Sequence, residues 1–194
     1  MTNMMSDFED RQMSAVNEIR CSYSGYQLIQ QNFGTDMNRS WVSYQKGFGN
    51  TTGTYWIGND ALHNMTKNNT CRLMVVLQSR TNSLWYQANY SYFMVESAVT
   101  FYKVHISGFV GGNASDSLSA LGSMNSRPFS TYEADHDNWN NNCAAECGGG
   151  WWYGSCNYAI LNGGYPAGGA GHQFSWYYLP PGSVLNASRI YILC

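Results

Sequence analysis

The pattern of hydrophobic and polar positions between residues 26 and 110 predicts several short strands and few helical segments. Residues 73–77 form a continuous apolar run, which is typical of a central strand. Residues 84–95 alternate loosely between apolar and polar side chains. In residues 100–110 the alternation is clearer, with Tyr102, Val104 and Ile106 on one face and Lys103, His105 and Ser107 on the other. Together these three segments predict an antiparallel sheet.

Shorter elements precede that sheet. Residues 26–30 and 55–57 are predicted strands, and residues 41–48 predict a helical turn that ends at nearby glycines. Asn59 is expected to be the N-cap of a short helix that continues to Met65. The combination of a sheet with short helices places the chain in the α+β class.

The two ends of the chain differ from this middle part. Residues 1–20 are polar, with mixed charge, and predict a poorly ordered leader in front of one domain over residues 21–194. From residue 111 onward Gly, Asn, Ser and Pro dominate. Residues 111–194 are therefore expected to be mostly loops and short strands around a metal site.

Composition limits the classes of function. Only 11% of the residues are charged, the formal net charge is −2, and aromatic residues make up 15%. Without a basic stripe, a nucleic-acid partner is not expected. No apolar run approaches the ~18 residues of a transmembrane helix. A chain poor in charge and rich in Tyr, Trp, Asn and Gly is typical of a loop-rich extracellular domain that binds by contact.

Six cysteines and seven Asn-x-Ser/Thr sequons agree with an oxidising, extracellular environment. The candidate glycosylation sites are Asn38, Asn50, Asn64, Asn68, Asn89, Asn113 and Asn186. Residues 1–20 contain no apolar segment of the kind found in signal peptides. We expect the chain to lie within a longer secreted precursor; the alternative is a protein that is not exported by that route.

The acidic, Asn-rich segment 135–143 is the strongest chemical signal in the chain. Asp135 and Asp137 stand two residues apart in a loop that ends at Cys143, and Cys156 follows 13 residues later across a Gly-Trp-Trp segment. Hard cations such as Ca²⁺ bind side-chain and backbone oxygens of one tight loop. A short disulfide would hold such a loop in shape. The segment therefore predicts a calcium site.

Several motifs in the same order resemble those of fibrinogen-related domains. Residues 41–50 (WVSYQKGFGN) and 55–59 (YWIGN) match one conserved block of that family, and residues 107–109 (SGF) with 116–118 (DSL) match a second. The most specific block covers residues 129–163, including GWWY at 150–153. The resemblance runs from about Cys21 to the C-terminus and implies a central twisted antiparallel sheet beside a loop-rich calcium-binding subdomain.

The resemblance also implies the chemistry of the acidic loop. Asp135 and Asp137 would bind Ca²⁺ through their carboxylates and Trp139 and Asn141 through their backbone carbonyls, whereas Glu133 and His136 would not be direct ligands. It implies a Cys143–Cys156 disulfide. The usual partner of Cys21 lies earlier than this chain begins, and a Cys21–Cys194 pair is one open alternative; sequence alone leaves the pairing of Cys21, Cys71, Cys147 and Cys194 open.

In sugar-binding relatives a pocket for acetyl groups adjoins the second cysteine, where the preceding peptide bond is cis. Here that bond is Ser155–Cys156, and the candidate ligand-binding residues are Ser155, Cys156, Asn157, Tyr158, Tyr165, His172 and Trp176. The chain departs from the family pattern in three ways: Asn157 replaces a His, Cys147 stands where an aromatic residue is common, and the segment 163–176 is shortened. The missing His and the missing aromatic residue favour a protein-binding module instead.

No catalytic function is expected, because the chain has neither a Gly-x-Ser-x-Gly motif nor histidines at zinc-ligand spacing. The leading hypothesis is a secreted, calcium-binding, lectin-like recognition module that binds acetylated glycans. The alternative is a module of the extracellular matrix or of a receptor ligand, which binds protein and holds a purely structural calcium. The oligomeric state stays open.

Overall fold

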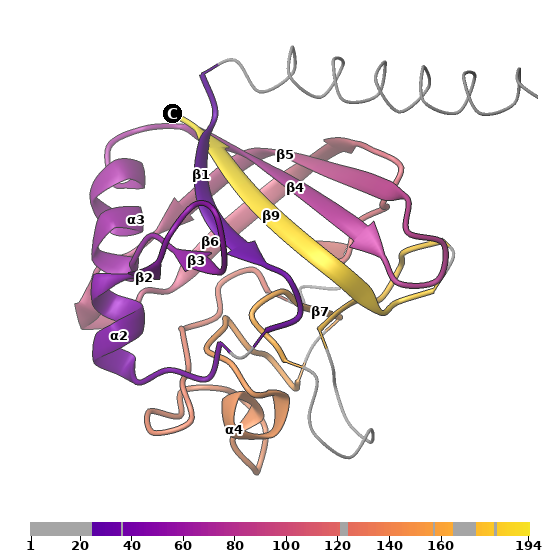
Figure 1. The fold of residues 1–194 in the computed structure, drawn as a ribbon. Helices are drawn as coiled ribbons and strands as arrows, with labels where there is room; N and C mark the ends of the chain where they lie inside the picture. The colour runs from indigo at the N-terminus through magenta and orange to yellow at the C-terminus, as the bar shows by residue number, and fades with distance from the viewer. Residues whose placement is uncertain (1–24, 36, 121–123, 157, 165–173, 181) are drawn as a thin grey trace, which may run out of the picture.

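A computed structural model describes residues 25–35, 37–120, 124–156, 158–164, 174–180 and 182–194. Within these residues, seven strands form one sheet in the order β2-β3-β1-β9-β4-β5-β6, and every pairing is antiparallel (Figure 1). The strands are β1 (Gln27–Asn32), β2 (Phe48–Gly49), β3 (Tyr55–Trp56), β4 (Cys71–Ser79), β5 (Trp85–Val95), β6 (Val104–Gly111) and β9 (Leu185–Leu193). The short strands β7 (Ala159–Ile160) and β8 (Ser175–Trp176) pair separately. The α+β class predicted from the sequence is confirmed.

Two helices lie at one side of the sheet in Figure 1. Helix α2 (Trp41–Lys46) begins because the Ser40 hydroxyl accepts a hydrogen bond from the Ser43 N–H, and it ends at Gly47. Helix α3 (Asn59–Thr66) begins one residue earlier than predicted, with Gly58 as its N-cap. The prediction that Asn59 caps this helix is wrong, because its buried side-chain oxygen accepts a hydrogen bond from the Trp56 indole instead.

The predicted strand over residues 100–110 is shorter than expected. Residues 98–100 form the 3₁₀ turn η1 (Ala98–Thr100), and Phe101 and Tyr102 both adopt left-handed backbone conformations, with φ of 55° and 52°. Such conformations interrupt a strand, so β6 begins only at Val104. Tyr102 is nevertheless buried, as the alternating pattern indicated, because the turn directs it into the core.

The long C-terminal strand β9 is the largest difference from the predicted fold. It lies between β1 and β4 in the middle of the sheet. Ile190 of β9 pairs with Val75 of β4 on one side and with Gln30 of β1 on the other. Residues 185–193 therefore belong to the sheet and not to the loop-rich half expected over 111–194. The alternation of buried Ile190 and Ile192 with half-buried Arg189 and Tyr191 was the signal in the sequence.

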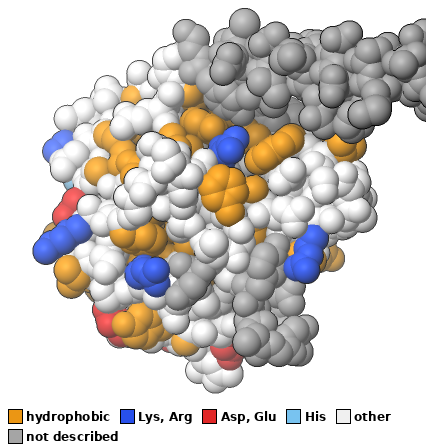
Figure 2. Space-filling view, viewed as in Figure 1, with side chains coloured by type: hydrophobic (Ala, Val, Ile, Leu, Met, Phe, Trp, Pro, Cys, Tyr) orange, Lys and Arg blue, Asp and Glu red, His pale blue; other side chains and the backbone are white. Residues whose placement is uncertain are grey.

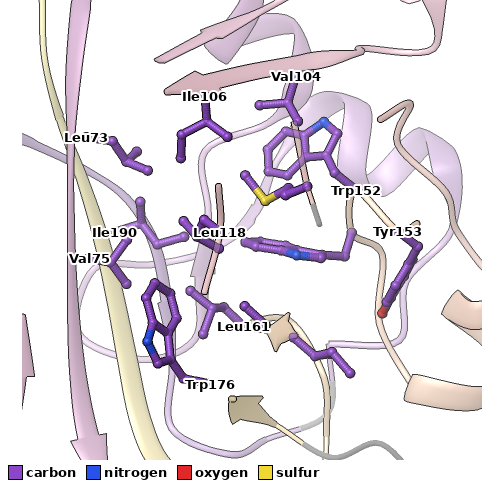
Figure 3. Close-up of a cluster of buried hydrophobic side chains, with 14 of the residues drawn as sticks. Leu73, Val75, Val104, Ile106, Leu118, Trp152, Tyr153, Leu161, Trp176 and Ile190 are labelled. Atoms are coloured by element: carbon purple, nitrogen blue, oxygen red, sulfur yellow. The ribbon is translucent and has the colours of Figure 1, made fainter. Parts of the chain in front are cut away.

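The core fills the space between one face of the sheet and the loop-rich half of the chain. In Figure 3, Leu118 lies beside Ile190 of β9, and Trp152 lies beside Val104 of β6. The Trp152 ring centroid is 5.1 Å from that of Phe129, and its indole N–H donates a hydrogen bond to the Tyr102 carbonyl at 2.8 Å. The aromatic residues of the GWWY motif thus join the loops to the sheet.

A disulfide between Cys71 and Cys194 closes the sheet at one end. Arg72 pairs with Leu193 in the neighbouring strands β4 and β9, so the two cysteines beside them are brought to a Cα–Cα distance of 4.1 Å. This pairing excludes the Cys21–Cys194 alternative considered from the sequence. Cys21 itself lies outside the described residues, as does the predicted leader over residues 1–20. No helix in the described part of the chain is long and apolar enough to cross a membrane.

Candidate calcium and ligand site

Asp137 organises the acidic loop through both of its carboxylate oxygens. Oδ1 accepts a hydrogen bond from the backbone N–H of Trp139 at 2.7 Å, and Oδ2 accepts one from the N–H of Cys143 at 2.9 Å. The side chain is half-buried, so these two bonds hold the loop closed over residues 137–143. The carboxylate therefore has a structural role before any cation is considered.

Asp135 and Asp137 face one another across this loop. One Asp135 carboxylate oxygen accepts a hydrogen bond from the Asp137 N–H at 3.2 Å. Burial raises the pKa of Asp137 above its usual range, and the nearby Asp135 raises it further, although the N–H donors of Trp139 and Cys143 act in the opposite direction. A bound cation would stabilise the charge of Asp137, which burial and the nearby Asp135 disfavour.

The donor set of the loop fits Ca²⁺ through side-chain and backbone oxygens together. Among the described residues no group of three or more acidic, His or Cys side chains could hold a metal, so two carboxylates must be supplemented. No described hydrogen bond uses the carbonyl of Trp139 or Asn141, and both residues are exposed. These carbonyls and water could complete an oxygen-only ligand set, which suits a hard cation. The Ca²⁺ site itself remains a prediction.

Residues around the loop fix its position. Asn142 accepts the Ala145 N–H as the N-cap of α4 (Cys143–Cys147), while its amide nitrogen donates to the carbonyls of Thr131 and Tyr132. His136 points away from the two aspartates: its ring donates from Nδ1 to the Phe129 carbonyl at 2.8 Å and stacks on Phe101 with 3.9 Å between ring centroids. This arrangement agrees with the expectation that His136 is not a metal ligand.

The structure places a disulfide between Cys143 and Cys156, the pair implied by the family motifs. It joins the start of α4 to Cys156, three residues beyond the end of the GWWY segment. The predicted cis peptide at Ser155–Cys156 is wrong: no described peptide bond is cis. Cys156 instead turns the chain through a left-handed backbone conformation with φ of 55°, which changes the chain direction without a cis bond.

Only part of the predicted ligand pocket lies at the described surface. Ser155 is exposed, Tyr158 is half-buried, and Cys156 is 5% exposed. Trp176 is wrong as a pocket residue, because it is fully buried and its indole donates to the Ala114 carbonyl at 2.9 Å. The remaining three predicted residues lie outside the described residues: Asn157, Tyr165 and His172.

Two tyrosines that sequence analysis did not select lie beside Tyr158. Tyr177 is 59% exposed and Tyr178 is 38% exposed, and their ring centroids are 5.0 and 6.0 Å from that of Tyr158. The Tyr177 N–H donates to the Tyr158 carbonyl at 2.7 Å, which holds the two segments together. We call Tyr158, Tyr177 and Tyr178 the tyrosine cluster. In the sequence, the Tyr-Tyr pair directly after Trp176 was the signal that could have identified these two residues.

Cys147 does not take the place of a pocket aromatic residue. It is 2% exposed, and burial raises the pKa of its thiol to about 12. Such a thiol is neutral and unreactive at physiological pH. Its side chain belongs to the core beneath α4.

The candidate glycosylation sites differ in accessibility. Five of the asparagines are exposed: Asn38, Asn50, Asn64, Asn68 and Asn113. Asn89 and Asn186 lie half-buried in β5 and β9. The Asn89 amide also accepts from Gln87 and donates to the Gly111 carbonyl, so it is held within the sheet.

Comparison with known proteins identifies the family. The family model for the C-terminal globular domain of fibrinogen beta and gamma chains matches residues 1–182. The chain belongs to the family of fibrinogen-related domains. The family match includes residues 1–20, so the domain boundary drawn at residue 21 stays a prediction.

Relatives of this fibrinogen-related domain are extracellular recognition or binding proteins and not enzymes. Over 76% of its own length, the chain is 39% identical to the protein scabrous of Drosophila melanogaster. Over 86% of its own length, it is 36% identical to human ficolin-3. It spans only 18% and 55% of those two proteins.

Solved structures of fibrinogen-related domains have the same fold. The fibrinogen-like globe domain of human ANGPTL6 superposes with a TM-score of 0.77 at 29% identity, covering 87% of this chain and 77% of that one. A lamprey fibrin D-dimer complexed with the peptide Gly-His-Arg-Pro-amide gives a TM-score of 0.76 at 25% identity, covering 87% and 61%. The predicted fold is therefore confirmed.

Proposed function

We propose that this fibrinogen-related domain is a secreted recognition module that binds acetylated glycans beside a calcium-stabilised loop. The observation that supports this most directly is the tyrosine cluster, in which Tyr177 and Tyr178 are exposed and Tyr158 stands two residues after Cys156, the end of the disulfide-closed loop. Exposed tyrosine rings combine apolar area with a hydroxyl, and both suit a sugar. The methyl of an acetyl group would contact the rings, while the exposed Ser155 could bond its carbonyl.

Calcium would act on the shape of the loop and not on the ligand's chemistry. Asp135 and Asp137, with the carbonyls of Trp139 and Asn141, would hold the ion. Asp137 also accepts a hydrogen bond from the N–H of Cys143, the residue that begins α4 and forms the disulfide. By neutralising the charges of the two aspartates, the ion would stabilise this contact. Calcium would thus order the segment that leads to Ser155.

The calcium proposal predicts that Asp135→Asn abolishes the thermal stabilisation produced by Ca²⁺. The asparagine keeps the oxygen that accepts the Asp137 N–H but removes one charge from the pair. For the unchanged chain, Ca²⁺ at a hundredfold excess over its dissociation constant should contribute about 2.7 kcal/mol. This corresponds to a rise in the unfolding midpoint of roughly 5–10 °C for a domain of this size, measured by circular dichroism.

Glu146→Gln is the matched control, because Glu146 is an exposed acid on α4 that touches neither aspartate in the described contacts. It should keep the full calcium response. A response that survives Asp135→Asn, or one lost equally in Glu146→Gln, would contradict the assignment of the site.

The ligand proposal predicts calcium-dependent retention of the domain on N-acetylglucosamine resin, with release both by free acetate and by a chelator. Tyr177→Ala should reduce retention severalfold, because this ring is the most exposed of the cluster. Val99→Ala, at an 87% exposed residue of η1, should have no effect. Failure of the folded, calcium-stabilised domain to bind the resin would reject acetylated sugars as the ligand.

A protein ligand is the second candidate. The trans Ser155–Cys156 peptide and the burial of Trp176 both depart from the acetyl pocket implied by the family. The lamprey fibrin structure was solved with a short peptide ligand. If the resin fails to bind, the same tyrosine cluster is the surface to test with peptides, using Tyr177→Ala again as the reporting variant.

A further inference from the structure

The face of the sheet that points away from the core has its own side-chain layer. Figure 2 shows hydrophobic side chains gathered on this side of the molecule, with basic side chains between them. Met74 and Val76 of β4 point to this face, opposite the core residues Leu73 and Val75, yet they are only 1% and 4% exposed. Arg189 of β9 pairs with Val76 in the sheet register and lies in the layer that covers it.

Neighbours from β1, β5 and β9, and from the residue that follows β1, hold the guanidinium group of Arg189. Its central carbon lies 5.0 Å from the ring centroid of Trp85 and 5.8 Å from that of Phe33. Its Nε donates a hydrogen bond to the side-chain oxygen of Gln31 at 2.8 Å, and Tyr191 supplies a further hydrogen-bonding contact. Contacts of both kinds restrict the side chain to one orientation.

The orientation of Gln31 is itself determined. Its amide nitrogen donates to the Gly53 carbonyl at 2.6 Å, so its amide oxygen must face the guanidinium. Gln31 is 4% exposed, and therefore the Nε–H of Arg189 is bound from the protein side. The Arg189 residue as a whole is half-buried, so part of it remains accessible to solvent.

Arg189 retains N–H donors that these contacts do not use. A guanidinium has five N–H donors in a planar fork. Gln31 and Tyr191 engage two of them at most, and within the described part of the chain no carboxylate is recorded in an ion pair with Arg189. Packing over Val76 alone would need only the aliphatic stem, so it does not require the oriented fork.

We propose that Arg189, with Trp85, Phe33 and Gln31, forms a binding site for the carboxylate or sulfate group of an acidic saccharide. An ordered guanidinium fork binds such anions through two parallel hydrogen bonds. Phe33 is 41% exposed and offers flat apolar area for the C–H face of a sugar ring. This site lies on the large sheet, in or directly after strands β1, β5 and β9. These strands do not contain Asp135, Asp137 or the tyrosine cluster. The ligand of this site is recognised by its negative charge and not by an acetyl group.

The direct test is an NMR titration of the ¹⁵N-labelled chain in a chelator, with three disaccharides: one with a uronic acid, one with a sulfate and one neutral. We expect the Arg189 Nε–H and Trp85 indole signals to shift with the acidic sugars and not with the neutral one. The two acidic arms separate carboxylate from sulfate recognition. If neither acid moves these signals, or if the neutral sugar moves them equally, the proposal is overturned.

Substitution tests the role of the planar fork. Arg189→Lys keeps the charge and the stem over Val76, and should weaken binding of the acidic sugar about tenfold or more, because the bidentate contact is lost. Arg72→Gln removes an exposed charge from β4 without a described ring contact, and should change the dissociation constant by less than about twofold. Equal losses in both variants would show unspecific attraction and reject the site.

The chelator keeps this test separate from the proposed calcium-dependent function. Binding at Arg189 should persist without Ca²⁺, so failure of the calcium or acetyl proposals would leave it unaffected. Should Arg189→Lys fail to fold, the titration of the unchanged chain decides alone.

Discussion

Replacing both Cys71 and Cys194 by alanine should lower the free energy of unfolding by about 5 kcal/mol, the larger of the losses expected from the two described disulfides. The cysteines are 123 residues apart, so their bond removes the entropy of a long loop from the unfolded chain. For Cys143 and Cys156, which are 13 residues apart, the same chain-entropy argument gives about 3 kcal/mol. Denaturant unfolding of both double variants, without calcium, would measure the difference.

The expected order of these two losses has a structural basis beyond loop length. Cys71 and Cys194 lie at the adjoining ends of β4 and β9, and β9 has strand neighbours on both sides. Loss of this disulfide frees the end of a central strand. A smaller loss for Cys71/Cys194 than for Cys143/Cys156 would contradict the argument and indicate that the end of β9 is held mainly by sheet hydrogen bonds.

Trp152→Ala should destabilise the domain by about 3–5 kcal/mol, because it removes a fully buried ring from the join between loops and sheet. Trp152 is 1% exposed and packs against Trp56, Phe93 and Phe129 with centroid distances of 5.8, 6.3 and 5.1 Å. The variant also leaves the Tyr102 carbonyl without its indole donor. Thermal unfolding should show a midpoint lower by roughly 6–20 °C.

Trp139→Ala is the matched control for this prediction. The Trp139 side chain is 51% exposed, and the loop uses only its backbone. In calcium-free buffer its replacement should change stability by less than about 0.5 kcal/mol. Similar losses in the two tryptophan variants would mean that the exposed ring makes contacts comparable to those of the core.

Strand prediction from the sequence was accurate where a segment showed a clear apolar pattern. The continuous run at residues 73–77 became the internal strand β4, and the predicted strand over 84–95 became β5 almost without change. The prediction failed at Phe101 and Tyr102, where left-handed backbone conformations interrupt the alternation. It also failed at β9, because the Gly- and Asn-rich composition of residues 111–194 led to the prediction of loops and short strands only, and β9 is a nine-residue strand.

The candidate site was predicted in part. Asp135, Asp137 and the disulfide partners were identified because their chemistry and spacing are local. Tyr177, Tyr178 and the burial of Trp176 were not, because they depend on how β8 packs against β7 and the segment at Ala114. Arg189 was not identified either, since its aromatic neighbours Trp85 and Phe33 are remote in sequence.

By itself, the sequence determined the fold family, the α+β class and the acidic loop with its neighbouring cysteines, because each of these depends on residues close together in the chain. Only the tertiary structure decided the Cys71–Cys194 pair, the central place of β9, the tyrosine cluster and the surroundings of Arg189. All four depend on contacts between segments that are far apart in sequence. The physical reason is that strand pairing selects among many distant partners, and local patterns of hydrophobicity do not specify which partner is chosen.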